Sequence, residues 1–195
     1  MKRTILLFFL TLMVSGFGST AVAQFALKTN IVDDALLNVN LGAELRTAPQ
    51  WSFDLSGSLN AWTLNNGKRW RHWWVMPEAR YWFCRTFGGH FVAAHLVGGN
   101  YNIGMLDTDF SFLGTNFGKL KDYRYQGWGV GAGIGYGYRW VLGRHWDIEA
   151  EFGFGWVYTR SDIFECVDCG RKVENNRVHN YVGPTKVAVN LVYNF

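Results

Sequence analysis

The sequence predicts an all-β fold, namely a closed, eight-stranded antiparallel transmembrane β-barrel with short periplasmic turns and longer outer loops. Three observations support this prediction. The chain begins with an export signal, and apolar and polar side chains alternate with a period of two over long segments. In addition, 17% aromatic residues and 23 glycines accompany a mean hydropathy of only −0.05. A helical membrane protein would contain uninterrupted apolar stretches of about 18 residues, which this chain lacks.

The first 23 residues have the order of a secretory signal peptide. Lys2 and Arg3 precede an apolar run from Ile5 to Leu12, and small residues at 21–23 end the segment. Cleavage there would leave residues 24–195 as a single barrel domain. Because no cysteine follows the cleavage site directly, we expect no lipid anchor at the new N-terminus.

The exported part is close to neutral. Without Lys2 and Arg3, 17 of the 19 basic residues remain, against 15 acidic residues. The chain has no clustered basic arm, so nucleic acid is not expected as a partner.

The alternation is clearest in two consecutive segments, 127–142 and 146–160. The odd positions hold glycines, acids and Arg139, with Val141, Val157 and Thr159 as exceptions, and the even positions up to Tyr158 are apolar or aromatic. Strands of this length exceed the usual 5 to 6 residues of globular sheets and match the roughly 9 to 11 needed to cross a bilayer.

The same pattern along the chain predicts eight strands, at 25–32, 39–47, 51–62, 72–83, 90–105, 123–142, 146–160 and 185–195. Short connections then alternate with long ones, as in bacterial outer-membrane barrels; the long connections are 63–71, 106–122 and 161–184. The exception is the first connection, 33–38, which is short although this alternation predicts a long loop there. Pro77 predicts a bulge or a shorter fourth strand. The fifth strand mixes its faces, with Val92 and Leu96 on the nominally inner side.

Aromatic side chains gather near both ends of the predicted strands, as in interfacial girdles. The turn side has Trp51, Trp140, Trp146, Tyr193 and Phe195, and the loop side has Trp62, Trp73, Tyr123, Tyr125 and Tyr158. A soluble sandwich or lipocalin-like barrel is the alternative, but it would have to cover or expose the apolar faces of two long strands.

If the apolar face meets lipid, the other face collects charged residues inside the barrel. These are Lys28, Glu44, Arg46, Asp54, Glu78, Arg80, Arg139, Asp147, Glu149, Glu151 and Lys186. Buried charges are tolerable when they are paired and hydrogen-bonded. An eight-stranded barrel is only wide enough for side chains. We therefore expect a charge network that plugs the interior, and a diffusion pore is disfavoured.

The motifs that suggest an enzyme are weak. Glu149 and Glu151 could act as a glycosidase pair, but no sugar would reach them inside a closed barrel. The alternate glycines lack the helix that a dinucleotide loop requires. His72, His90, His95, His145 and His179 are scattered, and no serine lies beside one in a nucleophile motif. We expect no catalytic residues, cofactor or metal, although a composite lipid-modifying site at the outer rim stays open.

Cys166 and Cys169 lie in the longest predicted outer loop, where an oxidising compartment favours a local disulfide. A metal site, with His179 as a further ligand, and a redox role are the alternatives. Cys84 falls at the opposite end of the barrel and should be free.

Basic residues also crowd the predicted outer rim. Candidates for contact with anionic glycolipid are Lys68, Arg69, Arg71, Lys119, Lys121 and Arg124. The alternative is a set of solvated loop charges. At the other end, the last strand alternates and finishes on Tyr193 and Phe195, which resembles the endings read by the barrel-insertion machinery.

Several short motifs in a fixed order resemble one family over nearly the whole exported chain. They are Lys28-Thr29-Asn30, Asp34-Ala35-Leu36-Leu37, Asn40-Leu41-Gly42, Trp74 to Glu78, Arg80-Tyr81-Trp82, Gly89-His90-Phe91, Gly98 to Tyr101, Gly135 to Arg139, Cys166 to Gly170 and Gly183-Pro184-Thr185. The family is the domain-of-unknown-function 3575 family of outer-membrane barrels in Bacteroides-like bacteria. The resemblance implies the location, the fold and a loose association with fimbrial and adhesion genes, and it implies no catalytic residues.

These inferences predict a non-enzymatic protein of the bacterial outer membrane with a plugged interior. Its surface loops would serve structural, adhesion or fimbria-associated interactions. The expected partners are outer-membrane lipid and lipopolysaccharide, the barrel-insertion machinery, and fimbrial or surface-polymer proteins. A lipid-active rim enzyme and a narrow channel are the alternatives.

Overall fold

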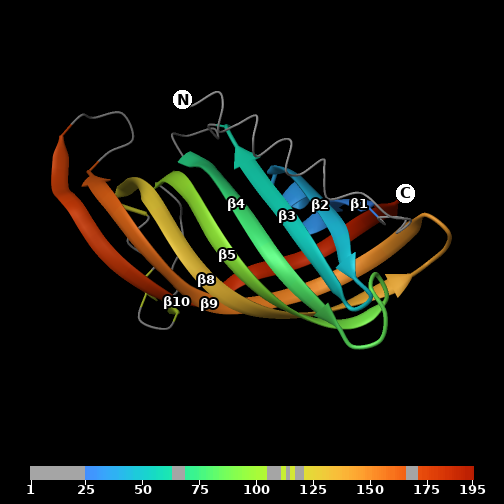
Figure 1. Cartoon of the computed structure of the whole chain (residues 1–195). Helices are drawn as coiled ribbons and strands as arrows, with labels where there is room; N and C mark the ends of the chain where they lie inside the picture. Colours follow the sequence, from blue (N-terminus) through green and yellow to red (C-terminus); the bar gives the residue numbers. More distant parts are fainter. Residues whose placement is uncertain (1–24, 63–68, 105–110, 113–114, 117–120, 166–170) are drawn as a thin grey trace, which may run out of the picture.

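The computed structural model describes residues 25–62, 69–104, 111–112, 115–116, 121–165 and 171–195 (Figure 1). Eight antiparallel strands form one ring-like sheet in the order β1-β10-β9-β8-β5-β4-β3-β2, and β1 pairs with both β10 and β2. The strands are β1 (Phe25–Asn30), β2 (Val39–Ala48), β3 (Trp51–Asn60), β4 (Arg69–Trp82), β5 (Gly89–Gly104), β8 (Arg124–Val141), β9 (Trp146–Phe164) and β10 (Lys172–Asn194). The short elements are α2 (Ile31–Ala35), β6 (Ser111–Phe112) and β7 (Thr115–Asn116).

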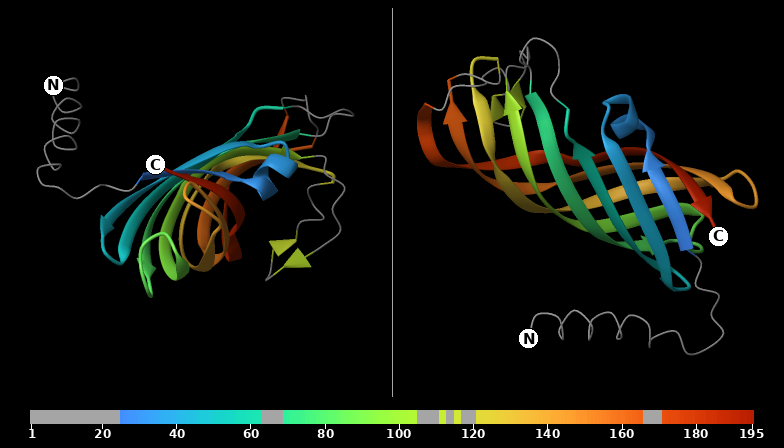
Figure 2. Two further views of the ribbon diagram at one scale, coloured as in Figure 1. Left: turned by 90° about the vertical axis from the view of Figure 1, so that its right-hand side faces the viewer. Right: turned by 90° about the horizontal axis from the view of Figure 1, so that it is seen from above.

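The wall of the ring is tallest at β8, β9 and β10, because these strands run past the ends of β1 to β3 (Figure 2). β10 has 23 residues and β1 has 6. The predicted loop at 161–184 is therefore mostly strand. Its polar residues suggested a loop, but pairing with β9 continues through this segment.

Above β1, the connection to β2 forms one turn of helix, α2. The side chain of Asn30 accepts a hydrogen bond from the backbone N–H of Val32 and so caps this helix.

The predicted alternation of faces is confirmed on the long strands. Between Gln126 and Trp140 of β8, every exposed residue is at an even position, such as Ile134 at 72% exposure, while Gly135, Gly137 and Arg139 are buried. The expectation for Val92 and Leu96 was wrong, since both are exposed on the outer face, and the buried residues Phe91, Ala93 and His95 occupy the alternate positions. Exposed and buried residues therefore alternate regularly over residues 90–96 of β5.

A β-bulge in β10 shifts its pairing with β9 between Pro184 and Lys186. Gly183 is buried above the bulge, and Ala188 and Asn190 are buried below it. Side chains alternate between the two faces along a strand, so the extra residue, Thr185, changes which positions face inward. Odd positions such as Gly183 face inward before the bulge, and even positions such as Ala188 face inward after it.

Pro77 causes neither of the expected irregularities. β4 continues through it to Trp82. The register is constant over residues 72–81 in the pairing with β3 and over residues 69–82 in the pairing with β5. Only the pairs of Met76 and Pro77 with β5 are missing. A proline without an N–H has interrupted one ladder and left the strand intact.

Large apolar side chains cover the outer face. Exposed tryptophans lie toward the turn side at positions 51, 140 and 146 and toward the loop side at 62, 73 and 128. Tyr125, expected in the loop-side girdle, lies instead at an odd position of β8, on the inner face. Within the described residues, no helix is long and apolar enough to cross a membrane.

Candidate functional site

The interior of the ring holds a connected network of buried charges. All but one of the predicted interior residues lie there, and Arg80 is at its centre. Its guanidinium contacts Glu78 at 2.6 Å, Glu151 at 2.6 Å, Glu149 at 2.9 Å and Glu44 at 3.2 Å. One cation from β4 thus connects carboxylates from β2, β4 and β9.

Arg139 and Lys28 extend the network on either side. Arg139 Nε donates to Glu149 at 2.8 Å, and Arg139 also pairs with Glu44. Lys28 Nζ lies 2.8 Å from Glu44 and 2.9 Å from Asp54. Every one of these side chains is at most 5% exposed, so each charge is held by partners and not by solvent.

Toward the turns, aromatic rings form the floor of the network. Trp82, Phe87 and Phe91 form a buried cluster with Ala93. The guanidinium carbon of Arg139 lies 5.0 Å from the ring of Trp82, and that of Arg80 lies 4.5 Å from the ring of Phe91. These cation–π contacts join the charges to the apolar floor and fill the space between them.

Of the remaining predicted interior residues, Lys186 and Asp147 lie inside the ring and Arg46 does not. Lys186 pairs with Glu78 at 2.8 Å and with Glu151 at 2.9 Å, and Asp147 accepts a hydrogen bond from Asn194 at 2.6 Å. Arg46 is a correction, because it is exposed. It lies two residues before the end of β2 at the turn-side rim, where its charge can stay hydrated.

His95 lies between Glu78 and Thr185, two residues that are distant from each other in the sequence. Its Nε2 lies 2.8 Å from Thr185 Oγ1, and its Nδ1 lies 3.6 Å from a carboxylate oxygen of Glu78. The order carboxylate, imidazole and hydroxyl is that of an activated nucleophile. However, the backbone of Gly133 packs over it, since a Cβ built there would lie 2.8 Å from Thr185 Oγ1. The contact lies inside the ring, away from the outer rim, and Thr185 also lines an interior cavity.

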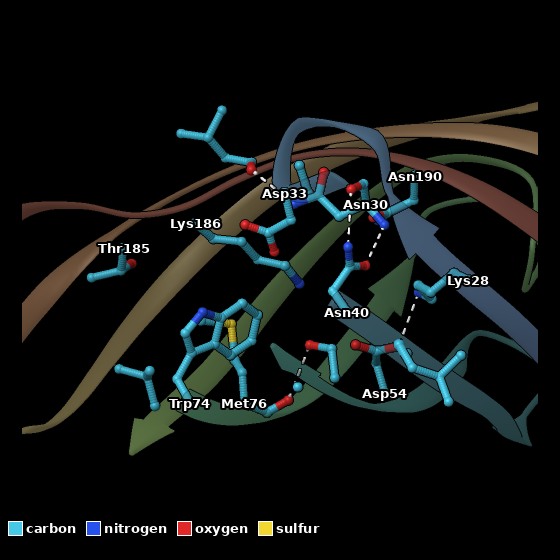
Figure 3. Close-up of a pocket in the computed structure, with 17 residues that line it drawn as sticks. Lys28, Asn30, Asp33, Asn40, Asp54, Trp74, Met76, Thr185, Lys186 and Asn190 are labelled. Atoms are coloured by element: carbon cyan, nitrogen blue, oxygen red, sulfur yellow. Dashed lines mark hydrogen bonds and ion pairs between the residues drawn. The ribbon is translucent and has the colours of Figure 1, made fainter. Parts of the chain in front are cut away.

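A cavity of about 260 Å³ lies above the network on the loop side (Figure 3). Its lining includes Lys28, Asp54, Trp74, Met76, Lys186 and Asn190. Hydrogen bonds between β1, β2 and α2 border it: Asn30 N donates to Asn40 Oδ1 at 2.6 Å, and Asn40 Nδ2 donates to Asp34 at 2.7 Å. The first family-like motifs of the sequence therefore hold the end of β1 to β2.

The predicted rim cations have different environments. Arg71 is exposed, and its Nε donates to the carbonyl of Ala61 at 3.1 Å. Arg124 is only 7% exposed and stacks on Phe164 at 4.1 Å, so it does not present a free charge. Lys121 is exposed. Lys68 and Lys119 lie outside the described residues, and only the backbone of Arg69 is described.

The remaining predicted positions are the C-terminal aromatic residues and the cysteines. Phe195 packs against Phe25 and Tyr193, with ring centroids 5.5 and 5.0 Å apart, so it joins the first and last strands. Cys166 and Cys169 lie outside the described residues, and Cys84 is an exposed free thiol. The described part of the chain contains no group of three or more His, Cys, Asp or Glu side chains that could hold a metal ion.

These features define a class of protein: an all-β chain whose single ring-like antiparallel sheet encloses a packed, ion-paired interior. The chain belongs to the family described as "Protein of unknown function (DUF3575)", whose model matches residues 5–195. This match confirms the resemblance found in the sequence motifs. The search of curated proteins and the search of solved structures each found no match.

Proposed function

We propose that this chain is a non-enzymatic barrel of the bacterial outer membrane with a sealed interior. In this proposal the tall wall of β8, β9 and β10 and the adjoining loops are presented at the cell surface for structural, adhesive or fimbria-associated contacts. The barrel-insertion machinery assembles it, and outer-membrane lipid surrounds it.

The observation that carries the proposal is the reversed distribution of polarity. Charged residues lie inside, whereas the outward positions of neighbouring strands are apolar in successive rows. Ile134 pairs with Phe154 and Tyr136 pairs with Phe152, and all four side chains are more than 40% exposed. Monomeric soluble proteins rarely expose apolar patches beyond a few hundred Å². A belt between rings of tryptophan is typical of a barrel in lipid.

The packed interior supports a structural or interaction role over transport. Arg80, Arg139 and Glu149 occupy the middle of the ring at no more than 1% exposure, and aromatic rings lie beneath them. An ion crossing the barrel would have to separate several buried ion pairs.

Two measurements test fold and sealing. On a detergent gel, the unboiled protein is expected to migrate faster than the boiled protein, because a barrel keeps its compact shape until heated. In planar bilayers, it is expected to give no discrete conductance steps. Identical mobilities would contradict the barrel, and stable conductance steps would favour the channel.

Cysteine labelling in intact cells tests location and orientation. With Cys166 and Cys169 replaced by serine, a membrane-impermeant maleimide should label an Asn175→Cys variant at the loop side. The native Cys84, at the turn side, should react only after the cells are broken. Equal labelling of both positions in intact cells would contradict the orientation.

A further inference from the structure

A polar platform lies on the outer face immediately above the apolar belt, on β4, β5, β8 and β9. Strand register defines its two rows. The upper row is Arg71, Asn102, Gln126 and Asp162, and the lower row is Trp73, Asn100, Trp128 and Arg160. The next outward row toward the turns is Val75, Gly98, Val130 and Tyr158. From this row to the lower row of the platform, the outward side chains thus change from mostly apolar ones to amide, indole and guanidinium groups.

The platform is the floor of a groove of about 590 Å³. All members of the two rows except Arg160 line it, together with Phe164 and Lys172. Trp73 and Trp128 remain 47% and 41% exposed. The side-chain oxygen of Asn102 is buried without a hydrogen-bond partner among the described residues. The groove therefore offers two exposed indole faces, and the side-chain amides of Asn100 and Gln126 lie in its lining.

The charges of the platform favour an anion. Arg71 and Arg160 are exposed, while Lys172 Nζ lies 2.7 Å from Asp162. The hydrogen bond from Lys172, followed by one from the backbone of Asn176, keeps the pKa of Asp162 below its ordinary value, so this acid stays ionised and paired. Asp162 and Lys172 offset each other, and the two arginines leave a net positive surface.

We propose that this groove binds the phosphorylated saccharide headgroup of an anionic glycolipid in the outer leaflet. Indole faces and side-chain amides suit sugar rings and hydroxyls, and guanidinium groups suit phosphate. The position directly above the belt selects a lipid over a free sugar, because acyl chains attached to a headgroup in the groove would lie against Val75 and Val130. The inference rests on the proposed membrane location and adds a defined lipid contact to it.

The test compares retention of short-core lipopolysaccharide by protein purified in detergent and inserted into phosphatidylcholine nanodiscs. The variants are the triple change Arg71→Gln, Asn102→Ala and Gln126→Ala, and the single change Trp128→Leu. The matched controls are Asn180→Ala, an exposed amide of β10 outside the groove, and Trp140→Leu, on the same strand at the opposite girdle. The free core saccharide and phosphatidylglycerol are the competing probes.

Both groove variants are expected to weaken retention about tenfold relative to their controls, which corresponds to about 1.4 kcal/mol. The free core saccharide should bind far more weakly than the intact glycolipid, and phosphatidylglycerol should not compete. Equal retention by variants and controls overturns the proposal. Equally tight binding of the free saccharide, or full competition by phosphatidylglycerol, also overturns it. The gel-mobility shift of each variant is measured in parallel, so that a failure to form the barrel is distinguished from a loss of binding.

Discussion

Arg80 shows how single residues hold this interior together. Its guanidinium contacts carboxylates of Glu44, Glu78, Glu149 and Glu151, and the guanidinium carbon lies 4.5 Å from the ring of Phe91. Because it is shared, its removal would leave several buried carboxylates with fewer partners. Breaking a buried ion pair by removing one partner typically costs 3 to 5 kcal/mol.

We therefore expect Arg80→Met to lower the free energy of unfolding by at least about 3 kcal/mol. The measurement is urea unfolding in lipid vesicles, followed by tryptophan fluorescence. The control is Arg46→Met, because Arg46 is exposed at the rim and exposed ion pairs contribute about 0 to 1 kcal/mol. Equal losses in the two variants would contradict the network at the centre of the ring.

At the scale of elements, β10 determines both the closure and the two-part geometry of the sheet. Its lower part pairs with β1 and β9, whereas its upper part pairs only with β9. The bulge at Thr185 lies between these parts and lets each present the correct residues inward.

Deleting Thr185 should prevent formation of the compact barrel. A one-residue slip exchanges the two faces of a strand. Without the extra residue, the part of β10 on one side of the deletion would therefore turn its charged side chains outward and its apolar side chains inward. The measurement is the fraction of unboiled protein with fast gel mobility. Thr185→Ala is the control, because it keeps the chain length and removes only the hydroxyl contact with His95. A compact deletion variant would show that the bulge is dispensable.

Phe195, the residue that follows β10, allows the effect on assembly to be separated from the effect on stability. We expect deletion of Phe195 to lower the membrane-inserted amount and to increase periplasmic degradation. Because Phe195 also packs against Phe25, the control is Phe25→Ala, which removes the same ring contact and keeps the C-terminus. Quantitative blots of both variants make the comparison. Equal losses would assign the effect to seam packing and not to an assembly signal.

At the scale of the whole molecule, the decisive property is which solvent the outer face meets. Ile134 lies in the apolar belt and is 72% exposed, whereas Gln126 lies on the same strand and the same face, above the belt. In water the two positions would tolerate a charge equally, but in a bilayer they would not.

Ile134→Lys should therefore reduce membrane insertion, with a loss of about 2 to 4 kcal/mol near the bilayer midplane. Gln126→Lys should cost less than about 1 kcal/mol, as expected near an interface. Folding into vesicles across a urea series gives both values. A tolerated lysine at 134 would contradict the membrane environment of the belt.

The number of strands in the main sheet, their antiparallel arrangement and most of the inward and outward positions could be predicted from the sequence alone. A period of two is a local property, so odd and even positions in β8 and β9 separate correctly without knowledge of partners. The charges predicted for the interior follow from the same alternation, and all except Arg46 lie there; Lys186 is partly exposed and the others are buried. The family also followed from the order of short motifs along the chain.

Side-chain contacts, strand ends and exposure at the rim depend on residues distant in sequence, so they became known only from the structure. The meeting of His95 with Thr185 joins residues far apart on β5 and β10, and no spacing signals it. The exposure of Arg46 depends on where β2 ends relative to the rim. The upper part of β10 became strand because β9 pairs with it, although its polar residues favoured a loop. Register and strand ends are set by hydrogen bonding between strands, so local alternation could not give them.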